Sequence, residues 1–358
     1  MTGEPLPFTT WSASGGRPDP LQIVLSAPGR TQSQNMADIR RIGVITSGGD
    51  ASGMNAAIRS VVRCAIDAGL EVVGIERGYL GLMQGQVIPM NRRSVSGIIN
   101  QGGTMLRTIR CEEIKTKEGL ERASRTLAEN SIDALVVIGG DGSFRGAHEL
   151  REMSGVPVVG IPASIDNDVW GTDETVGFDS AVNVAVRATD NLRDTAYSHE
   201  RTFLVEVMGR TRGFIALEVG LCTGAEYTLI PEVKENIEDI AQDLRESGSR
   251  GKKCVLIIVA EGYGDTREIA SYLSRASGLE TRLSVIGYIQ RGGSPTARCR
   301  KLAALFGSRA VEALLEGEES CIVGLQGKEI RTVQLRDTVS RTKEIDLSLY
   351  KLSKSISR

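Results

Sequence analysis

Apolar runs rich in valine and isoleucine alternate with helical patterns along most of this chain, and this alternation constrains the fold more than any other feature. The runs 42–47, 71–76 and 133–139 are separated by helical patterns from about Gly53 to Gly69 and near 117 to 130. A chain that repeatedly passes from a strand through a helix to another strand builds a parallel sheet with helices on both faces. The sequence therefore predicts an α/β fold.

A second set of the same elements follows. The run 157–162 closes the first unit; the strands and helices expected after it are 203–208, 254–260 and 283–289, with helices from about 180 to 197 and near 213 to 223. Runs this continuously apolar suit strands that are buried on both faces. A chain of 358 residues has room for two domains. Sheets of this kind bind ligands at the carboxyl ends of their strands, where loops and helix amino termini converge.

The composition excludes several classes of function. The 43 basic and 45 acidic residues leave no broad positive field for nucleic acid or an anionic membrane. Only two histidines occur, which argues against a His-rich metal centre and a Ser-His-Asp triad. The six cysteines form no CxxC pair and are expected to be free thiols. No apolar run approaches the ~20 residues of a membrane span, so we expect a cytoplasmic protein.

Residues 1 to about 37 differ in composition from the rest of the chain. They are rich in Pro, Gly, Ser and Thr and have no sustained helical or strand periodicity. Such a segment buries too little apolar surface to order itself. We expect 1–37 to be a disordered tail, a leader or an over-extended start, and the sequence does not choose among these.

Three loops after predicted strands carry the residues that suggest chemistry. In 46-TSGGDASGMNAAIR-59 the paired glycines allow close backbone approach to an anion, although they also suit a simple tight turn. In 139-GGDGSFRGA-147, Asp141 stands at a strand end, where Mg²⁺ could join it to phosphate oxygens. The lysine of a GxxxxGK[ST] loop is missing, which excludes a Walker-type site.

In 161-IPASIDNDVWGTD-173, Asp166 and Asp168 flank Asn167, close enough for one carboxylate to accept a proton while the other contacts a metal or hydroxyl. A plain Asx-turn is the alternative. Four arginines at strand boundaries, rather than on helix faces, suit a phosphate monoester better than an ordinary solvated surface; they are Arg201, Arg210, Arg282 and Arg291.

Taken together, these motifs resemble the phosphofructokinase family. The segments that carry the resemblance are SGGDASGMNAAIR, GGDGS, SIDNDVWGTDETVGFDSA, RDTAYSHER, VEVMGR, GAEYTLIPE and GYIQRGGSPT, in the family's order from residue 40 to about 325. The resemblance implies two similar three-layer αβα domains with mainly parallel sheets and the active site in the cleft between them. We predict a nucleotide domain of 38–177 plus 291–344 and a sugar-phosphate domain of 178–290 plus 345–358.

The resemblance also implies a reaction and its donor. The expected activity is transfer of a phosphoryl group from Mg-ATP to the 1-hydroxyl of fructose 6-phosphate in glycolysis. Pyrophosphate-using members tend to carry aspartate after the Mg²⁺-linked aspartate and lysine before the SIDND segment. This chain has Gly142 and Ala163. A carboxylate at 142 would repel the α-phosphate region, and a lysine at 163 could neutralise pyrophosphate, so ATP is favoured.

Matching positions give two sets of expected site residues. The nucleotide set is Gly49, Tyr79, Arg110, Cys111, Lys115, Asp141, Gly142, Ser143 and Gly146, with Asp141 as the metal residue. The fructose 6-phosphate set is Ser164, Asp166, Asp168, Arg201, Met208, Gly209, Arg210, Glu261, Arg282, Tyr288 and Arg291. Two positions depart from the family: Arg107 in a loop that usually carries glycine, and Tyr288 where histidine is common. A tyrosine can donate one hydrogen bond but carries no positive charge.

The implied catalytic residues are Asp166, Asp168, Arg110 and Arg210. Asp166 accepts the proton of the sugar 1-hydroxyl, and the two guanidinium groups offset developing charge on the transferred group. In bacterial members Arg201 and Arg282 reach across from a neighbouring subunit, so a homotetramer is expected. The alternatives are a pyrophosphate-dependent enzyme and a catalytically silent sensor of nucleotide or sugar phosphate.

An effector site for ADP or phosphoenolpyruvate between subunits is a further expectation from the resemblance. Its residues are Arg59, Arg63, Arg92, Arg193, Glu226, Lys252 and Lys253. Gly97 replaces an acidic residue that is common in that pocket, and ordinary surface charge is the alternative.

Overall fold

The computed structural model describes residues 39–252 and 254–357. The expected tail 1–37 lies outside the described residues. Within the described ranges the strands form two sheets. The large sheet contains β1 (Arg41–Thr46), β2 (Glu71–Ile75), β3 (Val87–Met90), β4 (Ala134–Gly139), β5 (Val158–Ser164), β6 (Val176–Gly177), β11 (Ser320–Gln326) and β12 (Glu329–Gln334). The small sheet contains β7 (Thr202–Val207), β8 (Tyr227–Leu229), β9 (Val255–Ala260) and β10 (Thr281–Val285).

Most strand pairs are parallel, as the alternating pattern predicts. The order in the large sheet is β12-β11-β5-β4-β1-β2-β3, with β6 paired to β5, and the small sheet has the order β10-β7-β9-β8. Only the pairs β2–β3 and β11–β12, among the strands described, are antiparallel. The expected α/β fold with mainly parallel sheets is therefore confirmed.

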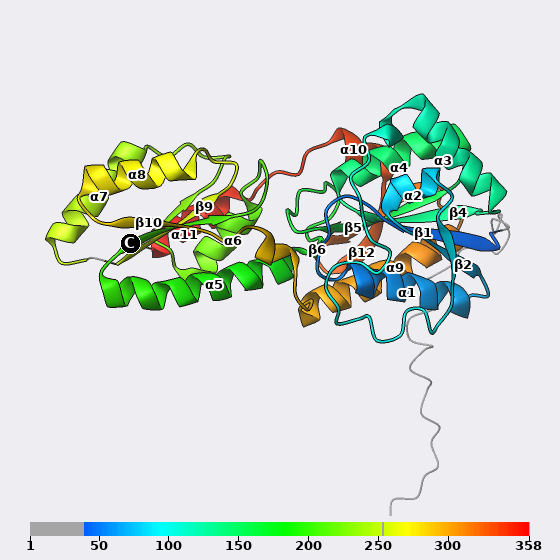
Figure 1. The fold of residues 1–358 in the computed structure, drawn as a ribbon, viewed down its shortest axis with the longest axis horizontal. Helices are drawn as coiled ribbons and strands as arrows, with labels where there is room; N and C mark the ends of the chain where they lie inside the picture. Colours follow the sequence, from blue (N-terminus) through cyan, green and yellow to red (C-terminus); the bar gives the residue numbers. More distant parts are fainter. Residues whose placement is uncertain (1–38, 253, 358) are drawn as a thin grey trace, which may run out of the picture. The chain divides into compact units, whose positions relative to one another are not determined.

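Helices cover both faces of each sheet (Figure 1). Their bounds are α1 Met54–Asp67, α2 Gly78–Met83, α3 Lys117–Glu129, α4 Asp141–Ser154, α5 Phe178–His199, α6 Phe214–Thr223, α7 Ile237–Ser249, α8 Thr266–Ser277, α9 Ala297–Leu315, α10 Leu335–Ser340 and α11 Leu347–Ile356. In Figure 1, α1 and α9 lie on one face of the large sheet and α2, α3 and α4 on the other, while α5 and α7–α8 lie on opposite faces of the small sheet. No helix in the described ranges is long and apolar enough to cross a membrane.

One continuous apolar core runs beneath α1 and α9 and on to α5 and α6. It includes Ile42 and Val44 of β1, Phe306 of α9 and Ile258 of β9, all of which are inaccessible to solvent. Separate clusters fill the space under α3 and α4 and under α7 and α8. The elements of the small sheet lie between residues 202 and 285. The domain boundaries given above stay a prediction.

The expected strand 283–289 is wrong in its bounds and its burial. The strand β10 ends at Val285, and Gly287–Arg291 forms a short 3-10 helix. Gly287 has φ 57°, a left-handed conformation that ends a strand and that glycine adopts readily. As an edge strand β10 is also exposed on one side, so Val285 keeps 54% of its surface exposed although its sequence is apolar.

Candidate functional site

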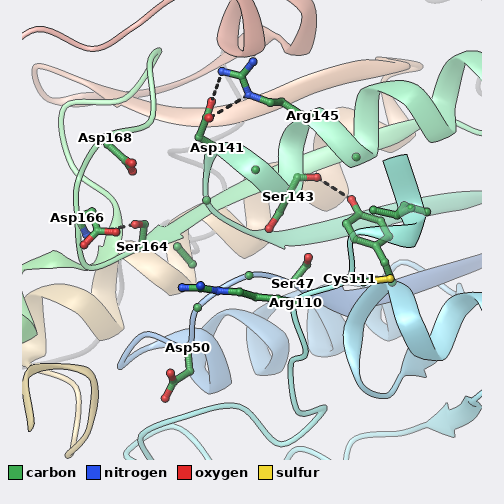
Figure 2. Close-up of a pocket in the computed structure, with 18 of the residues that line it drawn as sticks. Ser47, Asp50, Arg110, Cys111, Asp141, Ser143, Arg145, Ser164, Asp166 and Asp168 are labelled. Carbon is green, nitrogen blue, oxygen red and sulfur yellow. Dashed lines mark hydrogen bonds and ion pairs between the residues drawn. The ribbon is translucent and has the colours of Figure 1, made fainter. Parts of the chain in front are cut away.

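Four loops that follow strands meet around one cavity of about 810 Å³, which Tyr79, Arg291 and residues between 110 and 115 also line. Three of them follow β1, β4 and β5, which are parallel neighbours in the large sheet, so their carboxyl ends point to the same edge. The fourth follows β7 of the small sheet and contributes Arg210. Figure 2 shows Asp141, Asp166 and Asp168 around one part of this cavity, which Arg110 also lines. The topology therefore brings carboxylates and guanidinium groups from distant parts of the sequence together.

Glycines let the first two loops approach each other closely. A Cβ atom at Gly139, the last residue of β4, would lie 2.6 Å from the backbone oxygen of Ser47. Gly48 has φ 87°, and a Cβ at Gly49 would overlap the guanidinium of Arg291. The tight turn that the sequence suggests for this loop therefore occurs, and the approach of its backbone to an anion stays a prediction.

The helix α4 begins at the carboxylate of the loop that follows β4. Asp141 is the first residue of the helix, where the free backbone amides favour negative charge. Its Oδ2 accepts from Arg145 Nε at 3.0 Å, one turn further along the helix. The Oγ of Ser143 is buried and has no hydrogen-bond partner among the described residues. A buried hydroxyl without a partner costs free energy, so it marks a place for a ligand or water.

Tyr79 forms part of the wall behind this helix. Its side chain is 2% exposed, and its hydroxyl donates to the backbone oxygen of Ser143 at 2.7 Å. Burial raises the pKa of this phenol far above its ordinary value, so it stays protonated and remains a donor. Gly146 faces the same ring, because a Cβ there would lie 3.2 Å from Tyr79 Cε2. These contacts fix the start of α4 against α2.

Asp166 is the carboxylate in the cavity whose pKa is shifted most. The residue is 3% exposed, and its Oδ2 lies 3.2 Å from Arg210 Nε. Its Oδ1 is buried without a hydrogen-bond partner in the part of the chain that the structure describes. Burial, followed by the charge of Asp168, raises the pKa of Asp166 to about 6, while Arg210 and Arg291 oppose the rise. Burial also raises the pKa of Asp168.

Asn167, and not the aspartates, makes the turn that presents both carboxylates. It adopts φ 53°, a left-handed conformation that asparagine tolerates better than most residues. Its Oδ1 accepts from Thr175 N at 3.0 Å, and its Nδ2 donates to Asp173 O at 3.2 Å. The structural Asx role considered for this segment therefore belongs to Asn167, which leaves Asp166 and Asp168 directed to the cavity.

Glu261 holds the backbone that carries Arg210. Its Oε1 accepts from Arg210 N at 2.6 Å and from Gly209 N at 3.2 Å. Arg210 itself has φ 53°, and Gly209 has φ 139°, so this loop is strained for any residue with a side chain. A Cβ at Gly262 would overlap the backbone oxygen of Arg210. Glu261 therefore acts on the cavity through the position of Arg210.

The cavity is lined by the whole expected nucleotide set but by only part of the expected sugar-phosphate set. All nine expected nucleotide residues line the cavity. From the second set, the residues that line it are Ser164, Asp166, Asp168, Arg210 and Arg291. Three residues of this set are outside the cavity lining: Met208, Gly209 and Glu261. Glu261 accepts a hydrogen bond from Gly209, next to Arg210 in the chain. Tyr288 lies on the 3-10 helix and is 81% exposed.

Arg201 and Arg282 lie at the wrong end of their strands to reach this cavity. Arg201 precedes β7 and Arg282 is the second residue of β10, whereas Arg210 follows the carboxyl end of β7. A strand of six residues spans ~20 Å, which separates the two ends of the sheet. Arg201 Nε contacts Glu280 Oε2 at 2.8 Å, and Arg282 binds the other oxygen of the same carboxylate. Within one chain this pair of arginines is separate from the cavity.

Several lining residues were missed from the sequence. They are Ser47, Asp50, Glu112, Ile114, Gly140, Arg145, Glu149 and Ile165. Arg145 and Glu149 follow Asp141 at intervals of four residues on α4, so helical spacing alone places all three on one face. The spacing of four residues from Asp141 therefore identifies Arg145 and Glu149 from the sequence.

The residues around Asp141 fit a magnesium ion that is held mostly by a ligand's phosphates. Mg²⁺ commonly uses one or two carboxylates and completes its coordination with waters and phosphate oxygens. Asp141 supplies a partly exposed carboxylate, and the unpartnered Ser143 hydroxyl lies two residues further on. Within the described ranges no group of three or more His, Cys, Asp or Glu residues could hold a metal by itself. The donor set therefore suits a metal that arrives with a phosphate ligand.

The raised pKa of Asp166 predicts a cost in stability at neutral pH. The folded state binds this proton more tightly than the unfolded chain does, so stability falls as the pH rises from about 4 through about 6. We expect Asp166→Asn to raise the free energy of unfolding at pH 7 by ~1–3 kcal/mol, and to change it little near pH 4, where the aspartate is already neutral. Urea unfolding at both pH values checks this; an equal change at both pH values would contradict it.

Comparison with known proteins places the chain in a family. The family model described as phosphofructokinase matches residues 41–314, more than half of the chain. The chain belongs to the phosphofructokinase family. Curated relatives agree: the ATP-dependent 6-phosphofructokinase of Halothermothrix orenii is 49% identical over 331 residues, covering 89% of this chain and all of the relative. ATP-dependent 6-phosphofructokinase 1 of Thermus thermophilus is 50% identical over 317 residues, covering 88% and 98%.

Solved phosphofructokinases share the fold. The phosphofructokinase of Saccharomyces cerevisiae has a TM-score of 0.80 and 37% identity over 84% of this chain, which spans 45% of the longer yeast chain. A pyrophosphate-dependent phosphofructokinase from Marinobacter aquaeolei has a TM-score of 0.77 at 21% identity, covering 87% of this chain and 86% of that one. At that identity the likeness concerns the fold alone. The resemblance read from the motifs is confirmed at the level of the family.

Proposed function

We propose that this phosphofructokinase transfers the γ-phosphoryl group of Mg-ATP to the 1-hydroxyl of fructose 6-phosphate, giving fructose 1,6-bisphosphate and ADP in glycolysis. The observation that carries the proposal is the buried Asp166 carboxylate, paired with Arg210 at the edge of a cavity that is also lined by glycine loops, the amino end of α4 and residues between 110 and 115. The names of the curated relatives support ATP as the donor.

Asp166 has the features of the general base. Its pKa of about 6 lies near neutral pH, where a carboxylate is both ionised and basic enough to take a proton from an alcohol. Oδ2 is oriented by Arg210, which leaves Oδ1 as the acceptor. The hydroxyl proton passes to Oδ1 as the sugar oxygen bonds to the γ-phosphorus, and the bond from phosphorus to the β-phosphate oxygen breaks to release ADP.

The remaining charged groups bind and orient. Arg110 and Arg210 line the cavity and would offset charge that develops on the transferred phosphoryl group. Asp141 and Ser143 would hold Mg²⁺ together with donor phosphates, and the ion, when bound, neutralises phosphate charge. Asp168 lies two residues from the base and would contact the sugar hydroxyl.

The space beside Gly142 supports ATP over pyrophosphate. A Cβ atom added at Gly142 would meet nothing within 4 Å, so the cavity is open where the larger donor needs room. Ala163 lines the same cavity and brings no positive charge to a pyrophosphate. A paired assay with fructose 6-phosphate and either donor tests this: ATP is expected to support turnover and pyrophosphate is not. Turnover with pyrophosphate alone would select the runner-up, and turnover with neither would select the silent sensor.

We also propose that the working enzyme is a homotetramer in which subunits complete each other's sites. The support is the location of Arg201 and Arg282 at the amino ends of their strands, ~20 Å from the carboxyl ends that carry the cavity. Glu280 pairs the two guanidinium groups, so they form one positively charged unit on that edge of the small sheet.

We also propose that the enzyme is located in the cytoplasm, and cell fractionation checks this.

Regulation by ADP or phosphoenolpyruvate stays a hypothesis from the family resemblance. Several of the residues named for it already have partners in this chain: Lys252 Nζ lies 2.9 Å from Glu226 Oε1, and Arg92 Nη2 lies 2.9 Å from Asp67 Oδ1. Lys253 lies outside the described residues. We expect phosphoenolpyruvate to shift the steady-state curve for fructose 6-phosphate to higher concentrations; hyperbolic curves that superimpose with and without it would reject the site.

A further inference from the structure

The segment 341–346, between α10 and α11, crosses two of the loops that form the cavity. The guanidinium of Arg341 lies 4.6 Å from the ring centroid of Trp170, in the loop after β5. Two residues on, the Lys343 ammonium lies 5.2 Å from the ring centroid of Phe214, the first residue of α6. One side of this segment therefore packs on the loop that carries Asp166, and the other on the chain that follows Arg210.

Lys343 donates a hydrogen bond to the Asp166 loop, at a backbone carbonyl that also accepts a hydrogen bond from within the loop. Its Nζ donates to Asp173 O at 2.9 Å, and the same oxygen accepts from Asn167 Nδ2 at 3.2 Å. Asn167 makes the left-handed turn between Asp166 and Asp168, as described above. A charged donor on this oxygen strengthens the attachment that fixes the turn. Movement of Lys343 would therefore be transmitted to both carboxylates.

The backbone of Lys343 is bonded to the Arg210 loop. Its carbonyl oxygen accepts from Arg212 Nη2 at 2.7 Å, and Arg212 N donates to Gly209 O at 2.9 Å, which closes the turn around Arg210. Lys343 thus contacts both loops through different groups, its ammonium on one side and its carbonyl on the other. The 3.2 Å contact between Asp166 and Arg210 joins the ends of these same two loops.

We propose that Lys343 is a positioning residue that holds the Asp166 turn and the Arg210 turn in register for phosphoryl transfer. Asp166 and Arg210 follow strands of two different sheets, so no sheet hydrogen bonds fix their separation. A change of about 1 Å in the placement of reacting groups can cost up to ~10²-fold in rate. The lysine environment agrees with this assignment: burial lowers the pKa of Lys343 to about 8, which Asp173, Asp168 and Glu174 oppose, so the side chain is still mostly charged at neutral pH.

The test compares Lys343→Met, which keeps the length but removes the donor and the charge, with Lys343→Arg. The inference rests on the proposed function, so turnover of the unmodified enzyme with ATP and fructose 6-phosphate is measured first; its absence would reject the proposed function itself. We expect Lys343→Met to lower kcat by about 10-fold while the KM for ATP changes less than about 2-fold, and Lys343→Arg to recover most of kcat.

Two further variants separate positioning from general damage to the fold. Lys354→Met removes another C-terminal lysine, which lies in α11 with its Nζ 2.7 Å from Glu235 Oε1, and is expected to keep normal kcat. Arg212→Met removes the donor to Lys343 O and is expected to reproduce the kcat loss, which provides a test even where Lys343→Met does not fold. A kcat for Lys343→Met or Arg212→Met equal to that of Lys354→Met, or an arginine variant no better than methionine, would overturn the proposal.

Discussion

Asp166→Ser is expected to lower kcat by ~10²-fold or more while the affinity for fructose 6-phosphate is largely kept. Serine removes the carboxylate that we propose as the acceptor of the hydroxyl proton, and it leaves Arg210 and Arg291 in the cavity lining. The buried Asp166 has Oδ1 free to act, so the loss should fall on the chemical step and not on substrate binding. Steady-state kinetics with saturating ATP and varied fructose 6-phosphate give kcat and KM separately.

The matched control is Asp67→Ser. Asp67 lies at the end of α1, and its side chain is 81% exposed and paired with Arg92 on the surface, so its removal should leave kcat within about 2-fold. If Asp166→Ser kept a kcat near that of this control, Asp166 would lose the role of base. A large rise in KM with unchanged kcat would instead assign Asp166 to substrate binding.

Arg282→Ala is expected to cost at least ~30-fold in kcat/KM for fructose 6-phosphate although Arg282 lies outside its own chain's cavity. The reason is the proposed sharing of sites between subunits, in which this guanidinium binds the sugar phosphate of a neighbour. Co-expression of Arg282→Ala chains with Asp166→Ser chains should then restore activity. With random mixing, about a quarter of the sites combine an intact Asp166 with an intact Arg282.

Sites built from one chain give a different result in this mixture. Every such site would lack either Asp166 or Arg282, so activity would stay at the average of the two single variants. Arg201 lies beside Arg282 on Glu280 and should behave in the same way. Co-expression of Arg282→Ala with the Asp67→Ser control measures the activity that dilution with competent subunits alone restores.

The large elements of the fold could be predicted because a continuous run of apolar residues indicates a strand that is buried on both faces. The strands β4 and β9 are buried at every residue and β1 at every residue after Arg41, and each lies between two parallel neighbours in its sheet. The predicted bounds and burial of the last strand, 283–289, were wrong for a physical reason. An apolar run does not show whether a strand lies in the middle of a sheet or at its edge. Tyr288 and Ile289 are consequently exposed on a short helix beyond Gly287.

The residues of the cavity were partly predictable because strand-end loops of adjacent parallel strands must meet. This argument reaches Gly49, Asp141 and Asp166, which follow β1, β4 and β5. It does not reach Lys343, since the contacts that connect it to Asp173 and Arg212 join positions more than 100 residues apart. The assignment of residues to donor, metal and sugar stays a prediction that the variants above can test.

The most direct test of the central claim is to identify the product by phosphorus NMR. Purified protein is incubated with fructose 6-phosphate, ATP and Mg²⁺, in parallel with the Asp166→Ser variant. We predict a new phosphomonoester at the 1-position of the sugar, formed in equal amount with ADP, and at most ~1% of that rate in the variant. ADP released with inorganic phosphate, or no phosphorylated C1, would contradict the account.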